Sequence, residues 1–185
     1  MQARKFPPRI ENKDTRELAM EAAFQLLKVR RRSEKELAGR LALRGFSVAT
    51  VAAALARLVE LGLLNDEALA RDWAASRRSA GEGDLRIRRK LLERGLGRDR
   101  VDQAMAEAGQ EARAAGQEED EDTRAWNALT RRAKRMAGLD RDALYRRLGG
   151  YLVRQGFTID SAKKALRRFL AQLGEAGDAA PDEFE

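Results

Sequence analysis

The side chains of this chain best suited to chemistry are basic, and they are concentrated between positions 86 and 94. Arginine offers a planar fork of donors that matches a phosphate or a carboxylate, and lysine offers a compact positive charge. At helical spacing Arg86, Lys90 and Arg94 lie on one edge, and no acid follows any of them at i+4 to neutralise it. The segment therefore predicts a surface that binds the acidic groove of a partner protein or a DNA backbone. With bases from the preceding helix and from an equivalent segment near the N-terminus, the candidate binding residues are Arg40, Arg44, Arg71, Arg77, Arg78, Arg86, Arg88, Arg89, Lys90 and Arg94.

Each of these bases also has a plainer interpretation as part of a solvated helix face with local ion pairs, such as Arg89 with Glu93. Taken one position at a time, the plainer interpretation is favoured. Taken as a set, the unneutralised edge favours partner binding.

Catalytic chemistry lacks its usual residues, because the 185-residue chain contains no histidine and no cysteine. The commonest general base, the commonest zinc ligands and disulfides are therefore missing. Asp66 and Glu67 are interpreted as the start of a helix rather than a catalytic pair. We expect no enzymatic activity, no cofactor and no bound metal. No apolar run approaches the roughly 20 residues that span a bilayer, so a cytoplasmic protein without membrane contact is expected.

The elements that position these bases are predicted from a phrase that occurs three times, as RLALRGF, KLLERGL and YLVRQGF. Aligned on Gly45, Gly95 and Gly156, apolar residues recur at four and eight positions before the glycine and at six and ten after it. Each pair of offsets lies on one helical face, and glycine readily adopts the left-handed conformation that ends a helix. The pattern predicts two amphipathic helices joined at a glycine, with the next Leu or Phe folded back on the first helix.

A further helix precedes each pair, so three-helix units are predicted. The composition agrees, because 43% of residues are hydrophobic but only 5% are aromatic, which disfavours sheets. One unit has too few core side chains to be stable alone, so neighbouring units are expected to share a core. The predicted fold class is all-α, with three tandem three-helix repeat units forming an elongated, curved body.

The predicted boundaries follow from charge and from helix-start signals. Ser33 with Glu36 has the form of a capping box, Asp140 is placed to cap the second helix of the third unit, and Thr123 or Asp122 is placed to cap its first helix. The predicted segments are a basic N-terminal tail (1–13), unit 1 (14–64), unit 2 (65–108), an acidic linker read as a loop or an extended helix end (109–122), unit 3 (123–173) and an acidic C-terminal tail (174–185).

The second unit also resembles a known family. GLLNDEALARDWAASRRSAGEGDLRIRRKLLERGL (62–96) is similar to the signature stretch of the RecX family of bacterial regulators of the recombinase RecA. SEKELAGRLALRGF and LVRQGFTIDSAKKAL resemble the counterparts in the other units, so the resemblance extends over about 14–173. Three positions depart from the family pattern, which usually has an aromatic residue at Glu82, an acid or amide at Lys90 and an acid at Asn65. The features that carry the resemblance are Gly62, Leu64, Asp66, Ala70, Trp73, Ser76, Arg77, Gly81, Gly83, Arg86, Ile87, Leu91, Gly95 and Leu96.

This resemblance implies a non-enzymatic regulator that binds RecA protein and the RecA–DNA filament, with roles in DNA repair, DNA recombination and the SOS response. Proteins of this kind lie in or along the helical groove of the filament and inhibit filament growth, ATP hydrolysis and strand exchange. Three similar units could contact more than one filament subunit and gain avidity through their linkage. We expect the free protein to be a monomer.

An alternative is a helical protein that acts directly on DNA, because three-helix units with basic faces resemble helix-turn-helix modules. Against it, no helix concentrates base-reading side chains, and the acidic linker and tail would repel DNA. Weak direct binding to single- or double-stranded DNA stays open. Trp73 and Trp126 could stack on a base, but their helical spacing from Leu69 and Leu129 favours core positions.

Overall fold

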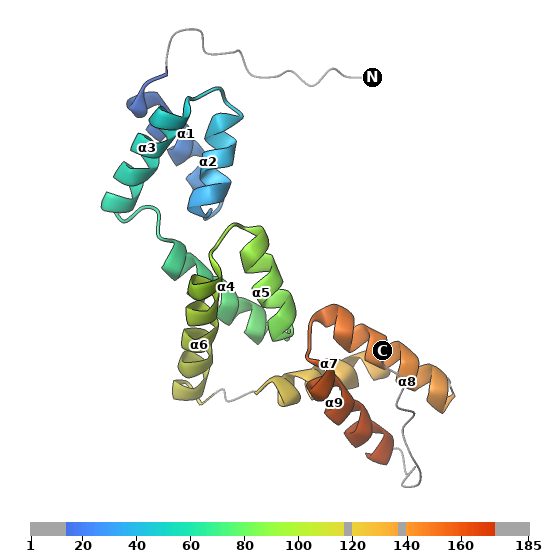
Figure 1. The fold of residues 1–185 in the computed structure, drawn as a ribbon. Helices are drawn as coiled ribbons and strands as arrows, with labels where there is room; N and C mark the ends of the chain where they lie inside the picture. Colours follow the sequence, from blue (N-terminus) through green and yellow to red (C-terminus); the bar gives the residue numbers. More distant parts are fainter. Residues whose placement is uncertain (1–13, 117–119, 137–139, 173–185) are drawn as a thin grey trace, which may run out of the picture. The chain divides into compact units, whose positions relative to one another are not determined.

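The computed structural model describes residues 14–116, 120–136 and 140–172, and within these ranges all regular structure is α-helical (Figure 1). The predicted all-α class is therefore confirmed. The two predicted tails lie outside the described residues. The helices are α1 (Arg16–Val29), α2 (Glu34–Ala42), α3 (Val48–Glu60), α4 (Asp66–Ser79), α5 (Asp84–Glu93), α6 (Arg98–Ala114), α7 (Glu121–Ala133), α8 (Arg141–Gln155) and α9 (Ile159–Gln172).

The repeat predicted from the three glycines is confirmed at α2, α5 and α8, each of which is followed within three residues by one of them. Gly45, Gly95 and Gly156 have φ angles of +91°, +88° and +84°, the left-handed conformation that a side chain disfavours. The apolar residue that follows each glycine folds back and is buried, with exposed fractions of 6%, 3% and 1% for Phe46, Leu96 and Phe157. The apolar residues four and eight positions before each glycine are also buried: Leu37, Leu41, Ile87, Leu91, Leu148 and Leu152.

The chain divides into two compact units, which we call the N-terminal unit (Met1–Ala70 with Leu92–Arg100) and the C-terminal unit (Arg71–Leu91 with Val101–Glu185). Their border runs inside α4, α5 and α6, whereas the sequence placed borders only between triplets of helices. In the N-terminal unit α1, α2 and α3 pack on one another around a core that includes Ala19, Leu41 and Leu58. In the C-terminal unit α7, α8 and α9 surround a second core.

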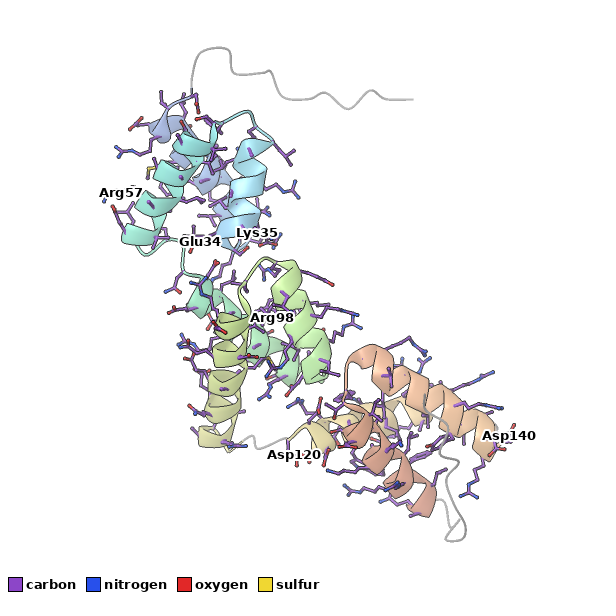
Figure 2. The ribbon with its side chains drawn as sticks, viewed as in Figure 1. Glu34, Lys35, Arg57, Arg98, Asp120 and Asp140 are labelled. Atoms are coloured by element: carbon purple, nitrogen blue, oxygen red, sulfur yellow. The ribbon has the colours of Figure 1, made fainter. Side chains whose placement is uncertain are left out.

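The start of α7 differs from the prediction. Asp120 is its N-cap and accepts a hydrogen bond from the backbone N–H of Thr123 at 2.7 Å, so the prediction that Thr123 or Asp122 caps this helix is wrong (Figure 2). Several consecutive acids suit an N-cap equally well, and Asp122 instead accepts a hydrogen bond from the hydroxyl of Ser161 on α9. The first part of the predicted linker (109–122) is an extended helix end, one of its two predicted forms, because α6 continues to Ala114; at the other end of the linker, α7 begins at Glu121.

Within the C-terminal unit, the first turn of α5 lies against the C-terminal cap of α8. The backbone N–H of Gly83 donates to Gln155 O at 3.0 Å, and that of Leu85 donates to Gly156 O at 3.0 Å. A Cβ atom on Gly83 would overlap the backbone of Gly156, and a Cβ on Gly156 would overlap the backbone of Arg86. Two glycines are therefore required where these backbones meet.

A similar contact occurs within the N-terminal unit, where the first turn of α2 lies against the cap of α5. The Ser33 hydroxyl donates to Arg94 O at 2.6 Å, and the Lys35 side chain covers Gly95 (Figure 2 labels Lys35). The third cap is open, since nothing among the described residues lies within 4 Å of the position that a Cβ on Gly45 would take. We call the two occupied contacts the cap joints.

Candidate interface for an acidic partner

Three of the predicted binding residues belong to the N-terminal unit, and two of them stabilise it. Arg94 donates to Glu36 Oε2 at 3.0 Å and to Arg31 O at 3.2 Å, and its side chain is only 14% exposed. Arg44 donates to Ala22 O at 3.2 Å, which ties the end of α2 to α1. Arg40 is exposed in the last turn of α2. Arg94 is therefore part of a cap joint rather than one of a row of bases with Arg86 and Lys90.

The carboxylate of Glu36, which accepts a hydrogen bond from Arg94, has a pKa below its ordinary value of 4.5. Burial of Glu36 acts most strongly and raises the pKa, but hydrogen bonds from Arg94, Ser33 and Arg30 together lower it. Folding therefore lowers this pKa, so the stability that Glu36 contributes is complete above about pH 4.5 and is lost as the pH falls through its folded-state pKa.

We accordingly expect the free energy of unfolding to fall more steeply with acid in the unmodified protein than in Glu36→Gln. Glutamine still suits the capping box but does not titrate, so only the charge contribution is removed. Urea unfolding followed by circular dichroism between about pH 3 and pH 6 measures the two slopes. Equal slopes would show that Glu36 does not link folding to protonation.

In the C-terminal unit several predicted bases are engaged by acids of the same chain. Arg78 forms a two-point contact with Asp84 at 2.6 and 3.2 Å, and Arg88 pairs with Asp102. Arg71 on α4 lies 3.5 Å from a carboxylate oxygen of Glu111 on α6. Arg89 is exposed on α5.

The remaining three predicted bases converge on a carboxylate. Glu82, in the turn between α4 and α5, lies 3.3 Å from Arg86 Nε, 3.6 Å from Arg77 Nη1 and 3.6 Å from Lys90 Nζ. Arg77 and Lys90 also lie over the ring of Trp73, at 5.2 and 5.9 Å from its centroid. We call these five residues the Glu82 cluster. This edge is therefore partly neutralised, contrary to the prediction: no acid follows any of its bases at i+4, but Glu82 precedes Arg86 by four positions.

Neither tryptophan is a core residue, so the core interpretation is wrong for both. Trp73 is half-buried beneath the two cations of the Glu82 cluster. Trp126 is also half-buried, with the Arg168 guanidinium 4.3 Å from its ring centroid and Phe169 at 6.5 Å. In both places an arginine guanidinium lies over the aromatic ring in a cation–π contact.

Sequence reasoning missed a buried ionic network in the C-terminal unit. Arg124 on α7, whose side chain is 4% exposed, donates to Asp84 at 2.5 Å. Its burial lowers the pKa of Arg124, while Asp84 acts in the opposite direction. Glu121 accepts hydrogen bonds from the backbone N–H groups of Asp84 at 3.2 Å and Thr158 at 3.3 Å, which joins the first turns of α5 and α9. Of these two acids, Glu121 was predicted to lie in the acidic linker (109–122), and Asp84 was predicted to lie in unit 2.

Four exposed bases of the third triplet of helices were not predicted from the sequence. Arg146, Arg147 and Arg154 on α8 and Arg167 on α9 are exposed, and we call them the α8–α9 bases. Within the described ranges none of the four has a carboxylate at ion-pair distance. The signal in the sequence is the Arg-Arg pairs at 146–147 and 167–168, in a segment that contains few acids.

The described residues were compared with the requirements of a metal site and of a membrane span, and they meet neither. No group of three or more acidic side chains there could hold a metal ion. No helix in these ranges is long and apolar enough to cross a membrane.

Comparison with known proteins identifies the family. The first three-helix domain of RecX matches residues 19–58, and the second matches residues 65–105. The regulatory protein RecX of Streptomyces lividans is 32% identical over 179 residues, which cover 96% of this chain and 88% of that protein. RecX of Mycolicibacterium vanbaalenii is 36% identical over 150 residues, or 76% of each chain. The crystal structure of RecX from Lactobacillus salivarius has the same fold, with a TM-score of 0.68 over 85% of this chain and 97% of that chain at 16% identity.

The two matched domains coincide with the first two triplets of helices, and the curated relatives extend the match through the third. The signature stretch of the second triplet is therefore one part of a similarity that covers nearly the whole chain. This chain belongs to the RecX family of regulatory proteins.

Proposed function

We propose that this protein binds the RecA recombinase and its filament on DNA, and that binding inhibits filament growth, ATP hydrolysis and strand exchange. Membership of the RecX family supports a regulatory role, and the resemblance of the signature stretch implies RecA as the partner. Regulation then takes place through binding rather than through catalysis by this chain.

The observation that carries the proposal is the accessibility of the α8–α9 bases. An exposed arginine without an intramolecular acid can form charge-assisted hydrogen bonds with a partner and break none of its own. Most of the predicted bases of α4 and α5 would first have to leave Arg–Asp or Arg–Glu pairs. The α8–α9 bases, with Arg40, are therefore the first contacts proposed for an acidic surface of the filament.

The test is DNA-dependent ATP hydrolysis by RecA, measured while this protein is added at substoichiometric ratios with DNA in excess. The unmodified protein is expected to inhibit. The triple variant Arg147→Gln, Arg154→Gln and Arg167→Gln is expected to need about ten- to thirtyfold more protein for the same inhibition, because three charged contacts are lost.

The matched control removes three exposed bases from the N-terminal unit through Arg16→Gln, Lys28→Gln and Arg57→Gln, so the net charge changes equally. Inhibition by this control is expected to stay within about twofold of the unmodified protein. Equal losses in the two triple variants would reject the assignment of the α8–α9 bases. No inhibition by the unmodified protein at any ratio would reject RecA as the partner.

Direct action on DNA is the second candidate, because exposed arginines also bind phosphates. In the same titration it has a distinct outcome. Inhibition would then begin only when the protein saturates the DNA, and it would disappear as more DNA is added.

A further inference from the structure

The Glu82 cluster carries more positive charge than its own acid neutralises. Arg77, Arg86 and Lys90 surround one carboxylate, so the group retains two positive charges. The contacts are 3.3–3.6 Å long, which is ion-pair distance rather than the 2.7–3.2 Å typical of N–H···O hydrogen bonds. Among the described residues, Glu82 Oε2 accepts no hydrogen bond and the Nε atoms of Arg77 and Arg86 donate none. Glu82 therefore attracts these donors without satisfying them.

The backbone of Glu82 is held independently of its side chain. Its N–H donates to Arg77 O at 3.1 Å, and the N–H of Gly83 donates to Gln155 O at 3.0 Å in a cap joint. These backbone hydrogen bonds do not involve the carboxylate, so they do not depend on its contacts with the three bases. The Trp73 ring still holds Arg77 and Lys90 in place by cation–π contact after the carboxylate has left.

We propose that the Glu82 cluster is a binding site for a phosphodiester group of DNA, and that the Glu82 carboxylate is an internal anion that competes with the phosphate. A phosphate offers more acceptor oxygens than a carboxylate, so it reaches donors on both arginines and the lysine at once. This inference goes beyond regulation of RecA, because it assigns a site through which this chain binds DNA directly.

The experiment measures binding of the full chain to a fluorescently labelled single-stranded oligonucleotide by anisotropy, in the absence of RecA. Glu82→Gln is expected to tighten binding by about fivefold, since a competing charge is removed. The slope of log K against log salt concentration is expected to steepen by about 0.7, the value for one additional phosphate contact on a single strand. Adding Lys90→Gln to this variant is expected to abolish most of the gain.

The matched control is Glu60→Gln, which changes the net charge by the same amount. Glu60 lies in the N-terminal unit and pairs with Arg57 on α3 at 2.9 Å, so the control also frees one base from its acid (Figure 2 labels Arg57). It is expected to change affinity by less than about twofold. The inference is overturned if Glu82→Gln binds no more tightly than Glu60→Gln.

Two further arms make each outcome decisive. Glu82→Asp keeps the charge but shortens the side chain, so a smaller gain in DNA affinity is expected than for Glu82→Gln. This variant replaces Glu82→Gln if circular dichroism shows that Glu82→Gln is unfolded.

In the second arm, polyglutamate is titrated as a ligand that competes with DNA. Preference of the Glu82→Gln protein for polyglutamate over DNA would show that the site takes a protein carboxylate, and would reject the phosphodiester. Because RecA is absent, failure here leaves the proposed function untouched.

Discussion

Replacing Gly156 with alanine is expected to lower the free energy of unfolding by about 3–5 kcal/mol, whereas the same change at Gly45 is expected to cost about 1–2 kcal/mol. Both glycines end a helix with nearly equal positive φ angles, so the cost of a left-handed side chain is the same. They differ in their surroundings, because Gly156 lies against Arg86 in a cap joint and Gly45 faces open space. The difference between the two variants therefore measures the close approach alone.

Gly83→Ala separates the two effects further. Its φ angle is not positive, yet a Cβ there would overlap the backbone of Gly156, and backbone atoms cannot turn aside as a flexible side chain can. A loss of about 2–4 kcal/mol is expected. The free energy of unfolding is measured in urea. Tryptophan fluorescence monitors Gly83→Ala and Gly156→Ala, because the C-terminal unit contains Trp73 and Trp126, and circular dichroism monitors Gly45→Ala. Equal costs at Gly45 and Gly156 would contradict the cap joint.

The second large effect is expected at Asp84, where asparagine should lower the free energy of unfolding by about 2–4 kcal/mol. Asp84 is the carboxylate that Arg78 and the buried Arg124 share. An arginine with 4% of its side chain exposed cannot recover the lost interaction from water, and a buried charge becomes more costly when a charged contact is removed.

The matched control is Asp102→Asn, which removes the partner of Arg88 where both side chains are well exposed, at 62% and 40%. A change within about 0.5 kcal/mol is expected, because exposed ion pairs contribute little. Both variants are compared by tryptophan fluorescence in urea. Similar losses for the two would mean that Arg124 does not depend on Asp84.

The local sequence pattern was sufficient to predict much of the fold. The three glycines and their apolar offsets predicted the repeated helix–cap–helix arrangement, and Ser33 and Asp140 were predicted as N-caps, because these features depend on residues within about one turn of each other. The prediction failed where adjacent residues were equally suitable. At 120–123 several side chains are able to cap α7. In the structure Asp120 is the N-cap, and Asp122 instead accepts a hydrogen bond from Ser161 on α9.

The candidate interface was less predictable, because the net charge of a surface depends on pairs that are distant in sequence. Arg94 pairs with Glu36 across 58 residues, and Arg124 pairs with Asp84 across 40. The pairing of Glu82 with Arg86, by contrast, was visible locally, at helical spacing.

By itself, the sequence determined that this chain is a helical repeat rich in arginine and which glycines end its helices, since both follow from local periodicity and from the backbone freedom of glycine. Only the tertiary structure decided which arginines are available to a partner. It assigned most of those on α4 and α5 to acids of the same chain and left the α8–α9 bases exposed. The physical reason is that an ion pair forms where folding brings opposite charges within a few ångströms, and that distance is not a property of the sequence spacing.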